Sequence, residues 1–416
     1  MTVRPHALVI GGSVGGLFAA SLLRGIGWKV TVFERSTGDL AGRGAGIGIS
    51  QELLGVMRRI GARFDASIGV PIRSFIRLDA AGRTLFEHPR PMASSAWARV
   101  YRTVRDALPD EDYRAGMTLA RVEPSATGVT AHFADGTPVA GDLLIGADGS
   151  LSTVRRQFLP AVEPRYAGYI AWRGLIEEQA LPATSHAAIF EHIVFSFPAG
   201  EMMLAMPVPG AGDDMRPGHR RCYFIWYRPA EAHALRDLFT DAAGRHHGVS
   251  IPPPLIRPAL VAALKEDAQR RLAPPVAELV TRTAQPLLQA ITDLESPSLV
   301  FGRVALLGDA AFIARPHVAG GITKAALDAE CLAEALAATP GDIGAALARY
   351  GERQHDFGSR LVAHARRLGA GLATPETETP AAVPLAPEQI MCEYGAPHLL
   401  HEVDTVSLGA TAAAQS

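Results

Sequence analysis

The feature that most constrains this chain is a glycine-rich turn between two apolar runs near its start. His6–Ile10 is a short apolar run that leads directly into Gly11-Gly12-Ser13-Val14-Gly15-Gly16. The next stretch, Leu17–Gly27, spaces its apolar residues as a helix does, and Val30–Phe33 is a second apolar run. A strand, a tight turn, a helix and a second strand in this order predict a parallel α/β unit.

The same turn predicts a dinucleotide site. Unpaired N–H groups at a helix start suit a pyrophosphate, and Gly11 permits the turn while Gly16 lets the helix approach the strand. Ser13 stands where a third glycine is usual, and Val14 and Gly15 complete the turn. Glu34 closes the second strand 23 residues after Gly11, near the roughly 20-residue offset at which a carboxylate binds a ribose hydroxyl. A glycine turn with a purely structural role remains the alternative.

Two later strands also end in Gly and Asp residues. Leu143–Ile145 leads into Asp148-Gly149, and the apolar run Leu299–Leu307, which we expect to form one buried strand, leads into Asp309. Pro316 and Gly320-Gly321 then precede a predicted helix. Open α/β sheets bind ligands at the carboxyl ends of their strands, and a helix N-terminus carries about half a positive charge, which suits a ring that becomes anionic on reduction. An ordinary Asp-Gly turn is the competing interpretation of Asp148-Gly149.

Between these motifs the chain becomes rich in strands. From about Tyr166 to Pro229, apolar segments are separated by Pro and Gly, which predicts an inserted antiparallel sheet. In Cys222–Tyr227, period-two alternation puts Tyr223 and Tyr227 on one face and Phe224 and Trp226 on the other. We expect one face to cover a ligand pocket and the other to pack on the core or on a partner subunit, which leaves a homodimer open.

Composition limits the remaining function classes. Hydrophobic residues make up 48% of the 416, enough for a sizeable core, and the net charge of −2 argues against nucleic acid or a membrane surface as a partner. The three cysteines form neither a disulfide framework nor a metal pattern, and His219 and His246-His247 lack ligand spacing. No apolar run reaches the ~18 residues of a membrane span. We therefore expect a soluble, cytoplasmic protein with no metal.

In this order and at these separations, the three motifs resemble those of the single-component FAD-dependent aromatic hydroxylases, the p-hydroxybenzoate hydroxylase-like family, over about residues 5–370. Tyr166–Gly174 and Gly308–His317 are most similar to the branch of 2,6-dihydroxypyridine hydroxylase. The resemblance implies an α/β fold: an FAD-binding Rossmann-like parallel sheet with an inserted, mostly antiparallel β-sheet substrate domain and C-terminal helices. The corresponding domains are FAD-binding over 1–160 and 296–372, with the C-terminal helices in the second part, substrate-binding over 161–295, and a linker-like tail over 373–416.

The resemblance also implies the activity. Such an enzyme binds FAD non-covalently, takes NADH or NADPH and O₂ as co-substrates, and hydroxylates a small electron-rich aromatic ring through a C4a-hydroperoxyflavin. We expect a hydroxypyridine rather than a benzoate, because the segments Met202–Met206 and Tyr223–Tyr227 contain no arginine to pair with a carboxylate; Arg173 on the adjoining strand is the residue that could overturn this. The alternatives are an FAD-dependent reductase or dehydrogenase, and a non-catalytic flavin-binding module.

The candidate site residues follow from the motifs and the resemblance together. Those expected to bind the cofactor are Gly11, Ser13, Val14, Gly15, Gly16, Glu34, Arg35, Arg43, Asp148, Gly149, Asp309, Pro316, Gly320 and Gly321. Those expected to bind substrate are Trp172, Arg173, His192, Tyr223 and Tyr227, and those expected to act in catalysis are Tyr223, Tyr227, Pro316 and His317. The tyrosines could equally be ordinary strand residues, and His192 a solvated strand edge. Trp97 stands where many members of the family have an arginine.

Overall fold

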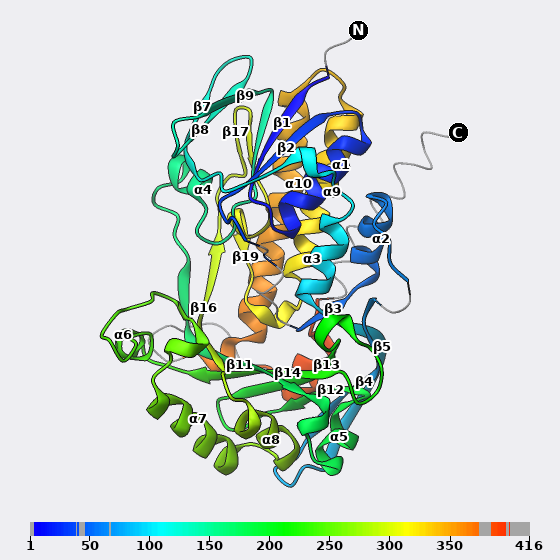
Figure 1. Cartoon of the computed structure of the whole chain (residues 1–416), viewed down its shortest axis with the longest axis vertical. Coiled ribbons are helices and arrows are strands. Elements are labelled where there is room, and N and C mark those ends of the chain that lie inside the picture. Colours follow the sequence, from blue (N-terminus) through cyan, green and yellow to red (C-terminus); the bar gives the residue numbers. More distant parts are fainter. Residues whose placement is uncertain are drawn as a thin grey trace.

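The computed structural model describes residues 4–38, 40, 46–65, 68–373, 384–396 and 399. Two large sheets lie at opposite ends of the long axis (Figure 1), with the N-terminal strands at one end and the green strands of the chain's middle at the other. The long helix α10 (Ile343–Leu368) runs between these ends. This arrangement confirms the predicted combination of a parallel sheet, an inserted sheet and C-terminal helices.

The first sheet forms around the predicted strand–turn–helix–strand unit. β1 (His6–Ile10) lies between two parallel neighbours, and its residues from Ala7 to Ile10 are buried because helices α1 and α9 join the same core. The strands, in spatial order, are β17 (Val300–Phe301), β18 (Val304–Leu306), β10 (Leu143–Gly146), β1, β2 (Lys29–Glu34) and β6 (Tyr113–Ala115). A small third sheet follows the predicted Asp-Gly hairpin and contains β7 (Leu119–Pro124), β8 (Val129–Phe133) and β9 (Pro138–Gly141).

The second sheet has ten strands and is mostly antiparallel. In spatial order they are β15 (Ser250–Ile251), β16 (Leu287–Glu295), β11 (Arg165–Glu177), β14 (Arg221–Pro229), β13 (Met202–Val208), β12 (His192–Ser196), β4 (Val70–Leu78), β5 (Thr84–Ala96) and β3 (Gly46–Ile49), with β19 (Phe312–Ile313) paired to β16. Three of them, β3 to β5, come from the stretch 1–160, so the first predicted domain contributes to both sheets. The predicted domain limits otherwise remain predictions.

The two faces of β14 have different neighbours, as its alternation predicts. Phe224 and Trp226 are fully buried in a cluster with residues of α7 (Pro258–Arg271) and α8 (Pro274–Arg282). These helices cover the outer face of the sheet in Figure 1. Tyr223 and Tyr227 belong to a separate cluster on the inner face. The outer face therefore packs on helices of this same chain.

The remaining helices connect the strands or pack on one of the two large sheets. They are α1 (Val14–Gly25), α2 (Gln51–Arg59), α3 (Trp97–Arg105), α4 (Thr153–Phe158), α5 (Ala183–Ile189), α6 (Leu235–Leu238), α9 (Gly321–Ala338) and α11 (Pro387–Glu393). No described helix is long and apolar enough to cross a membrane.

Two local expectations are wrong. The run Leu299–Leu307 is not one strand, because Gly302 adopts φ 62° and turns the chain between the antiparallel strands β17 and β18. The stretch after residue 373 is not only a linker, because α11 forms within it and Met391 and Tyr394 are buried against the second sheet.

Candidate active site

The glycine turn after β1 packs against a neighbouring strand end so closely that side chains are excluded. Gly11 has φ 112°, and a Cβ there would lie 2.3 Å from the carbonyl oxygen of Ala147. A Cβ on Gly16 would lie 1.9 Å from the carbonyl oxygen of Gly11. The backbone at this turn therefore needs glycine at both positions, as the spacing predicts, and a ligand can approach it closely.

The start of α1 leaves its first N–H groups available. Ser13 is the N-cap residue but makes no side-chain cap hydrogen bond, and the first turn carries no acidic residue. Ser13, Val14 and Gly15 line a cavity that extends from this helix start. Unpaired N–H groups and the positive end of the helix dipole suit a phosphate at this position.

Glu34 holds the turn to the end of β2. Its two carboxylate oxygens accept hydrogen bonds from the backbone N–H groups of Gly12 and Ser36, both at 2.8 Å. Each oxygen retains a lone pair that a ribose hydroxyl could use. Arg35 is exposed and is not part of the cavity wall among the described residues. Arg43, the other predicted cofactor arginine, lies outside the described residues.

Asp148 and Gly149 have different surroundings. Gly149 lines the cavity, whereas the Asp148 carboxylate accepts a hydrogen bond from the N–H of Thr153 at 2.6 Å and caps the start of α4. Burial raises the pKa of Asp148, and the hydrogen bonds it accepts oppose this rise. The buried Arg155 donates to the carbonyl oxygen of Ala310 at 3.1 Å, so it ties this loop to the loop of Asp309.

Asp309 follows β18 in a short helical turn and is exposed on the cavity wall. The turn is fixed by a buried ion pair, in which Lys324 Nζ lies 2.7 Å from Asp328 Oδ2. Lys324 also donates to the carbonyl oxygen of Gly308, and Asp328 accepts from the N–H of Gly308. Burial between the cavity walls raises the pKa of Asp309, while the Lys324 charge opposes the rise.

A second helix start faces the same cavity. The N-cap of α9 is Gly320, which has no side chain to cap the helix, and Gly320, Gly321 and Pro316 all line the cavity. The cavity has a volume of about 800 Å³, within the usual range of ligand pockets. The glycine turn, the exposed Asp309 and two uncapped helix starts fit FAD, whose phosphates and electron-rich ring both favour such donors.

The opposite wall of the cavity comes from the second sheet. Tyr223 and Tyr227 of β14 line it together with Arg173 of β11. Arg173 is paired across the strands with Ile225, the residue between the two tyrosines on their face. Burial raises the pKa of both tyrosines, although the Arg173 charge opposes the rise. Both hydroxyls therefore stay protonated at neutral pH and can donate hydrogen bonds, but they are poor bases.

His317 lies behind the cavity wall, not in it. Its neighbours Pro316 and Val318 line the cavity, while its own side chain is fully buried. His317 Nε2 lies 2.8 Å from the Tyr169 hydroxyl, and its ring centroid lies 4.5 Å from that of Tyr227. Burial lowers the pKa of His317 to about 3. The predicted catalytic contact is therefore not seen, and His317 is placed to support Tyr227 from behind.

Two predicted substrate residues lie away from the cavity. Trp172 is buried beside Trp226 in the cluster that contacts α7 and α8. His192 Nδ1 forms a 2.8 Å hydrogen bond with the hydroxyl of Ser74. Because the next residue, Ile193, lines the cavity, strand alternation puts His192 on the other face. The sequence pattern did not reveal which face of β11 and β12 is the inner one.

Sequence reasoning missed a part of the wall that comes from distant segments. Arg90 of β5 and Tyr394, which follows α11, both line the cavity, and Arg90 Nη1 donates to the carbonyl oxygen of Tyr394 at 2.6 Å. Because Arg90 and Arg173 both lie on the sheet wall, the expectation of a wall poor in arginine is wrong. Trp97, the first residue of α3, also lines the cavity. No local motif marks Arg90 or Tyr394, whereas Trp97 is visible in the sequence as a departure from the family's arginine.

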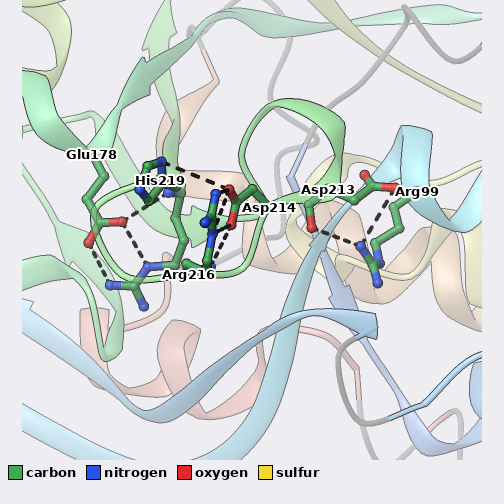
Figure 2. Close-up of polar contacts among 7 residues, drawn as sticks. Arg99, Glu178, Asp213, Asp214, Arg216 and His219 are labelled. Atoms are coloured by element: carbon green, nitrogen blue, oxygen red, sulfur yellow. Dashed lines mark hydrogen bonds and ion pairs between the residues drawn. The ribbon is translucent and has the colours of Figure 1, made fainter.

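The loop between β13 and β14 connects the two walls. Arg102 Nη2 of α3 forms an ion pair with Asp213 Oδ1 at 2.6 Å. Arg99 Nη1 donates a hydrogen bond to the backbone carbonyl oxygen of Asp213 at 3.1 Å. Figure 2 shows Asp213 facing Arg99 across this contact. The loop leads directly into the strand of Tyr223, while α3 begins with Trp97. These contacts therefore hold the loop before the Tyr223 strand on α3, whose first residue lines the cavity.

The chain is similar to known proteins over almost its whole length. Residues 166–293 match a family model described as FAD binding domain-like. The chain is 31% identical over 370 residues to the 2,6-dihydroxypyridine 3-monooxygenase of Paenarthrobacter nicotinovorans, covering 88% of this chain and 90% of that protein. The solved 2,6-dihydroxypyridine-3-hydroxylase of Arthrobacter nicotinovorans has a TM-score of 0.83 at 29% identity, covering 92% of this chain and 98% of that one. Klebsiella pneumoniae HpxO complexed with FAD and uric acid has a TM-score of 0.74 at 27% identity, covering 97% and 96%.

Proposed function

Because the chain belongs to the single-component FAD-dependent aromatic hydroxylases, we propose that it hydroxylates a small electron-rich ring of the hydroxypyridine class, with NADH or NADPH as the reductant. It is an FAD-dependent monooxygenase that acts on an aromatic ring. One observation indicates where the substrate ring binds. A single cavity has the uncapped start of α9 on one wall and Arg173, Tyr223 and Tyr227 on the other.

When bound, FAD would supply the redox chemistry, namely reduction by the nicotinamide and activation of O₂ for ring hydroxylation. Ser13, Val14 and Gly15 would hold its phosphates, Asp309 would accept from a hydroxyl of its chain, and Gly320 and Gly321 would face its ring. Glu34 would support the same site by holding the glycine turn and by accepting from the ribose.

The side chains of the sheet then bind and orient the substrate. Tyr223 and Tyr227 stay protonated, so they donate hydrogen bonds to a ring oxygen and do not remove its proton. Tyr394 and Phe75 give the ring an apolar surface, and burial of this wall excludes water. These residues therefore orient an electron-rich ring and provide no strong base.

The similarity to a relative that is named for 2,6-dihydroxypyridine supports the choice of a hydroxypyridine. The test is a panel of hydroxypyridines, phenols and hydroxybenzoates given to the FAD-loaded protein with NADH or NADPH, with products identified by mass spectrometry. We expect a hydroxylated pyridine and faster NAD(P)H oxidation when that ring is present. Rapid oxidation with no hydroxylated product would instead favour a flavin reductase or dehydrogenase, and flavin binding without oxidation would favour a binding module.

A cytoplasmic location and assembly as a homodimer complete the proposal. The three cysteines are free thiols, as is usual in a reducing compartment. A homodimer would use a surface other than Phe224 and Trp226, because these already pack on α7 and α8 of this chain. Light scattering of the purified holoenzyme would give twice the mass of the chain if the dimer forms, and the mass of one chain if it does not.

A further inference from the structure

Three arginines of the described residues line the cavity, and they differ in what balances their charge. They are Arg90, Arg173 and Arg315. Arg315 Nε lies 2.8 Å from Asp293 Oδ2, so a buried carboxylate balances it. Within the described part of the chain, no carboxylate lies within ion-pair distance of Arg90 or Arg173. The sheet wall therefore carries positive charge that the chain itself does not neutralise.

Arg90 has a structural use for its guanidinium. It donates to the carbonyl oxygen of Tyr394, and its guanidinium carbon lies 5.0 Å from the centre of the Phe75 ring. These two contacts hold the segment after α11 on the cavity wall. Arg90 thus explains the position of Tyr394, and its charge is partly satisfied by the carbonyl oxygen and the aromatic face.

Arg173 has no carboxylate partner among the described residues, and its side-chain hydrogen bond goes to the neutral hydroxyl of Tyr223. Its charge acts on the hydroxyls of Tyr223, Tyr227 and Tyr394, which are neutral groups. Its Nε is buried and lacks a hydrogen-bond partner among the described residues. The side chain as a whole is half-buried, and a partly desolvated cation is stabilised by an anionic partner. Among the described residues, the acidic ones of the cavity lining are Glu52 and Asp309, which belong to α2 and to the loop after β18, not to the sheet.

We propose that Arg173 determines substrate specificity by binding a negatively charged oxygen on the substrate ring. The proposal rests on the proposed hydroxylase function and names the class of ring: one that carries a carboxylate or an ionised ring hydroxyl. A guanidinium can bind such a group through two parallel hydrogen bonds, which fixes the angle of the ring as well as its position. Tyr223 and Tyr227, on the same face, then contact the ring beside the anion.

Matched pairs of rings test this with the FAD-loaded enzyme, because ring binding changes the flavin absorbance whether or not turnover follows. The first pair is 6-hydroxynicotinate and 6-hydroxynicotinamide, which differ only in a carboxylate. The second is 2,6-dihydroxypyridine and 2-hydroxypyridine, titrated across pH so that ionisation of the ring hydroxyl can be followed. We expect the charged member of at least one pair to bind at least about tenfold more tightly than its neutral match. The pair that discriminates identifies the kind of anion.

Variants test whether Arg173 causes the discrimination between charged and neutral rings. Arg173→Gln should remove the discrimination, and Arg173→Lys should keep part of it because the charge remains. Arg221→Gln is the control: Arg221 is on β14, is paired with Glu177 at 2.7 Å, and is outside the cavity lining. Should Arg173→Gln lose its flavin, the comparison of Arg173→Lys with the wild type replaces it, since only the two-bond geometry then changes.

The outcomes separate this inference from the function on which it rests. Equal binding of every charged and neutral pair by the wild type, absence of binding included, would overturn the role of Arg173, as would full discrimination by Arg173→Gln. A hydroxylated product formed alongside such equal binding would leave the hydroxylase function intact. Failure to hydroxylate any ring, with discrimination that depends on Arg173, would contradict the function and keep the anion site.

Discussion

The two ends of the cavity are built from different parts of the polypeptide. The end formed by α1 and α9 consists of backbone N–H groups and glycines, among them Gly15 and Gly320. The end formed by the second sheet consists of long side chains, such as Arg173 and Tyr223, that arrive on separate strands. Backbone groups are the same in every sequence, so the first end suits a cofactor shared by many enzymes. The second end can differ from one enzyme to the next and sets which ring is bound.

The largest expected effect is at the backbone end. Gly16→Ala would place a Cβ 1.9 Å from the carbonyl oxygen of Gly11, so the turn must shift and its N–H groups lose their alignment. We expect loss of bound flavin and destabilisation of about 1–3 kcal/mol, measured by flavin absorbance and thermal unfolding. Gly25→Ala is the control in the same helix, because a Cβ there meets no atom within 4 Å. If Gly16→Ala retained as much flavin as the control, the backbone end would not be the part that holds the cofactor.

Asp309→Ala tests the carboxylate on the same end. Removing one hydrogen bond to a charged group should weaken FAD binding by about 1–3 kcal/mol, which fluorescence titration of the apoprotein measures. Glu34→Ala should have a similar effect, because it frees the Gly12 N–H. Glu163→Ala, an exposed carboxylate outside the cavity lining, should leave the affinity unchanged. Unchanged affinity in both test variants would show that neither carboxylate serves the cofactor.

Tyrosine variants test the sheet end. Tyr223→Phe and Tyr227→Phe should each keep flavin and fold but lower kcat/KM about tenfold, as expected when one hydrogen bond to the reacting ring is lost. Tyr166→Phe is the matched control, because its hydroxyl donates to the carbonyl oxygen of Ala230 and is outside the cavity lining. Full activity in both test variants would make these tyrosines ordinary strand residues. Loss of flavin would place them at the cofactor end instead.

The smallest expected effect is the contribution of His317, behind the cavity wall, to the pH dependence of the free energy of unfolding. His317 has a pKa of about 3 in the folded protein, against about 6.5 when unfolded. Between these values the unfolded state binds more protons, so the free energy of unfolding falls as pH decreases from about 6.5 toward 3. The expected loss from His317 is about 0.8 kcal/mol at pH 6. Urea unfolding of the wild type and of His317→Asn would show the difference, and identical pH slopes would mean that His317 is not buried in its neutral form.

The sequence predicts the backbone end well because its information is local. The turn from Gly11 to Gly16 needs small residues within a few positions of a strand end, and that requirement can be recognised in the amino-acid sequence. The fold class follows for the same reason. Leu299–Leu307 was mispredicted because one left-handed glycine, Gly302, outweighs an otherwise continuous apolar run.

The sheet end could be predicted only in part, because its information is not local. Alternation correctly grouped Tyr223 with Tyr227, but it could not tell which face of β11 is the inner one, so Trp172 and Arg173 were both expected at the substrate. Tyr394 comes from a stretch whose composition is typical of a linker. It lies at the wall because its ring packs on Phe75 and Phe195 and because Arg90, about three hundred residues earlier, binds its carbonyl oxygen.

Isotope labelling tests the central claim most directly: that one cavity joins a flavin and an electron-rich ring for hydroxylation. The FAD-loaded protein would be given NAD(P)H, a hydroxypyridine and ¹⁸O₂, and the product analysed by mass spectrometry. The account predicts one ¹⁸O atom in each molecule of hydroxylated pyridine, with one NAD(P)H oxidised for each. Oxidation of NAD(P)H that yields only hydrogen peroxide with every ring, or a product whose new oxygen comes from water, would contradict it.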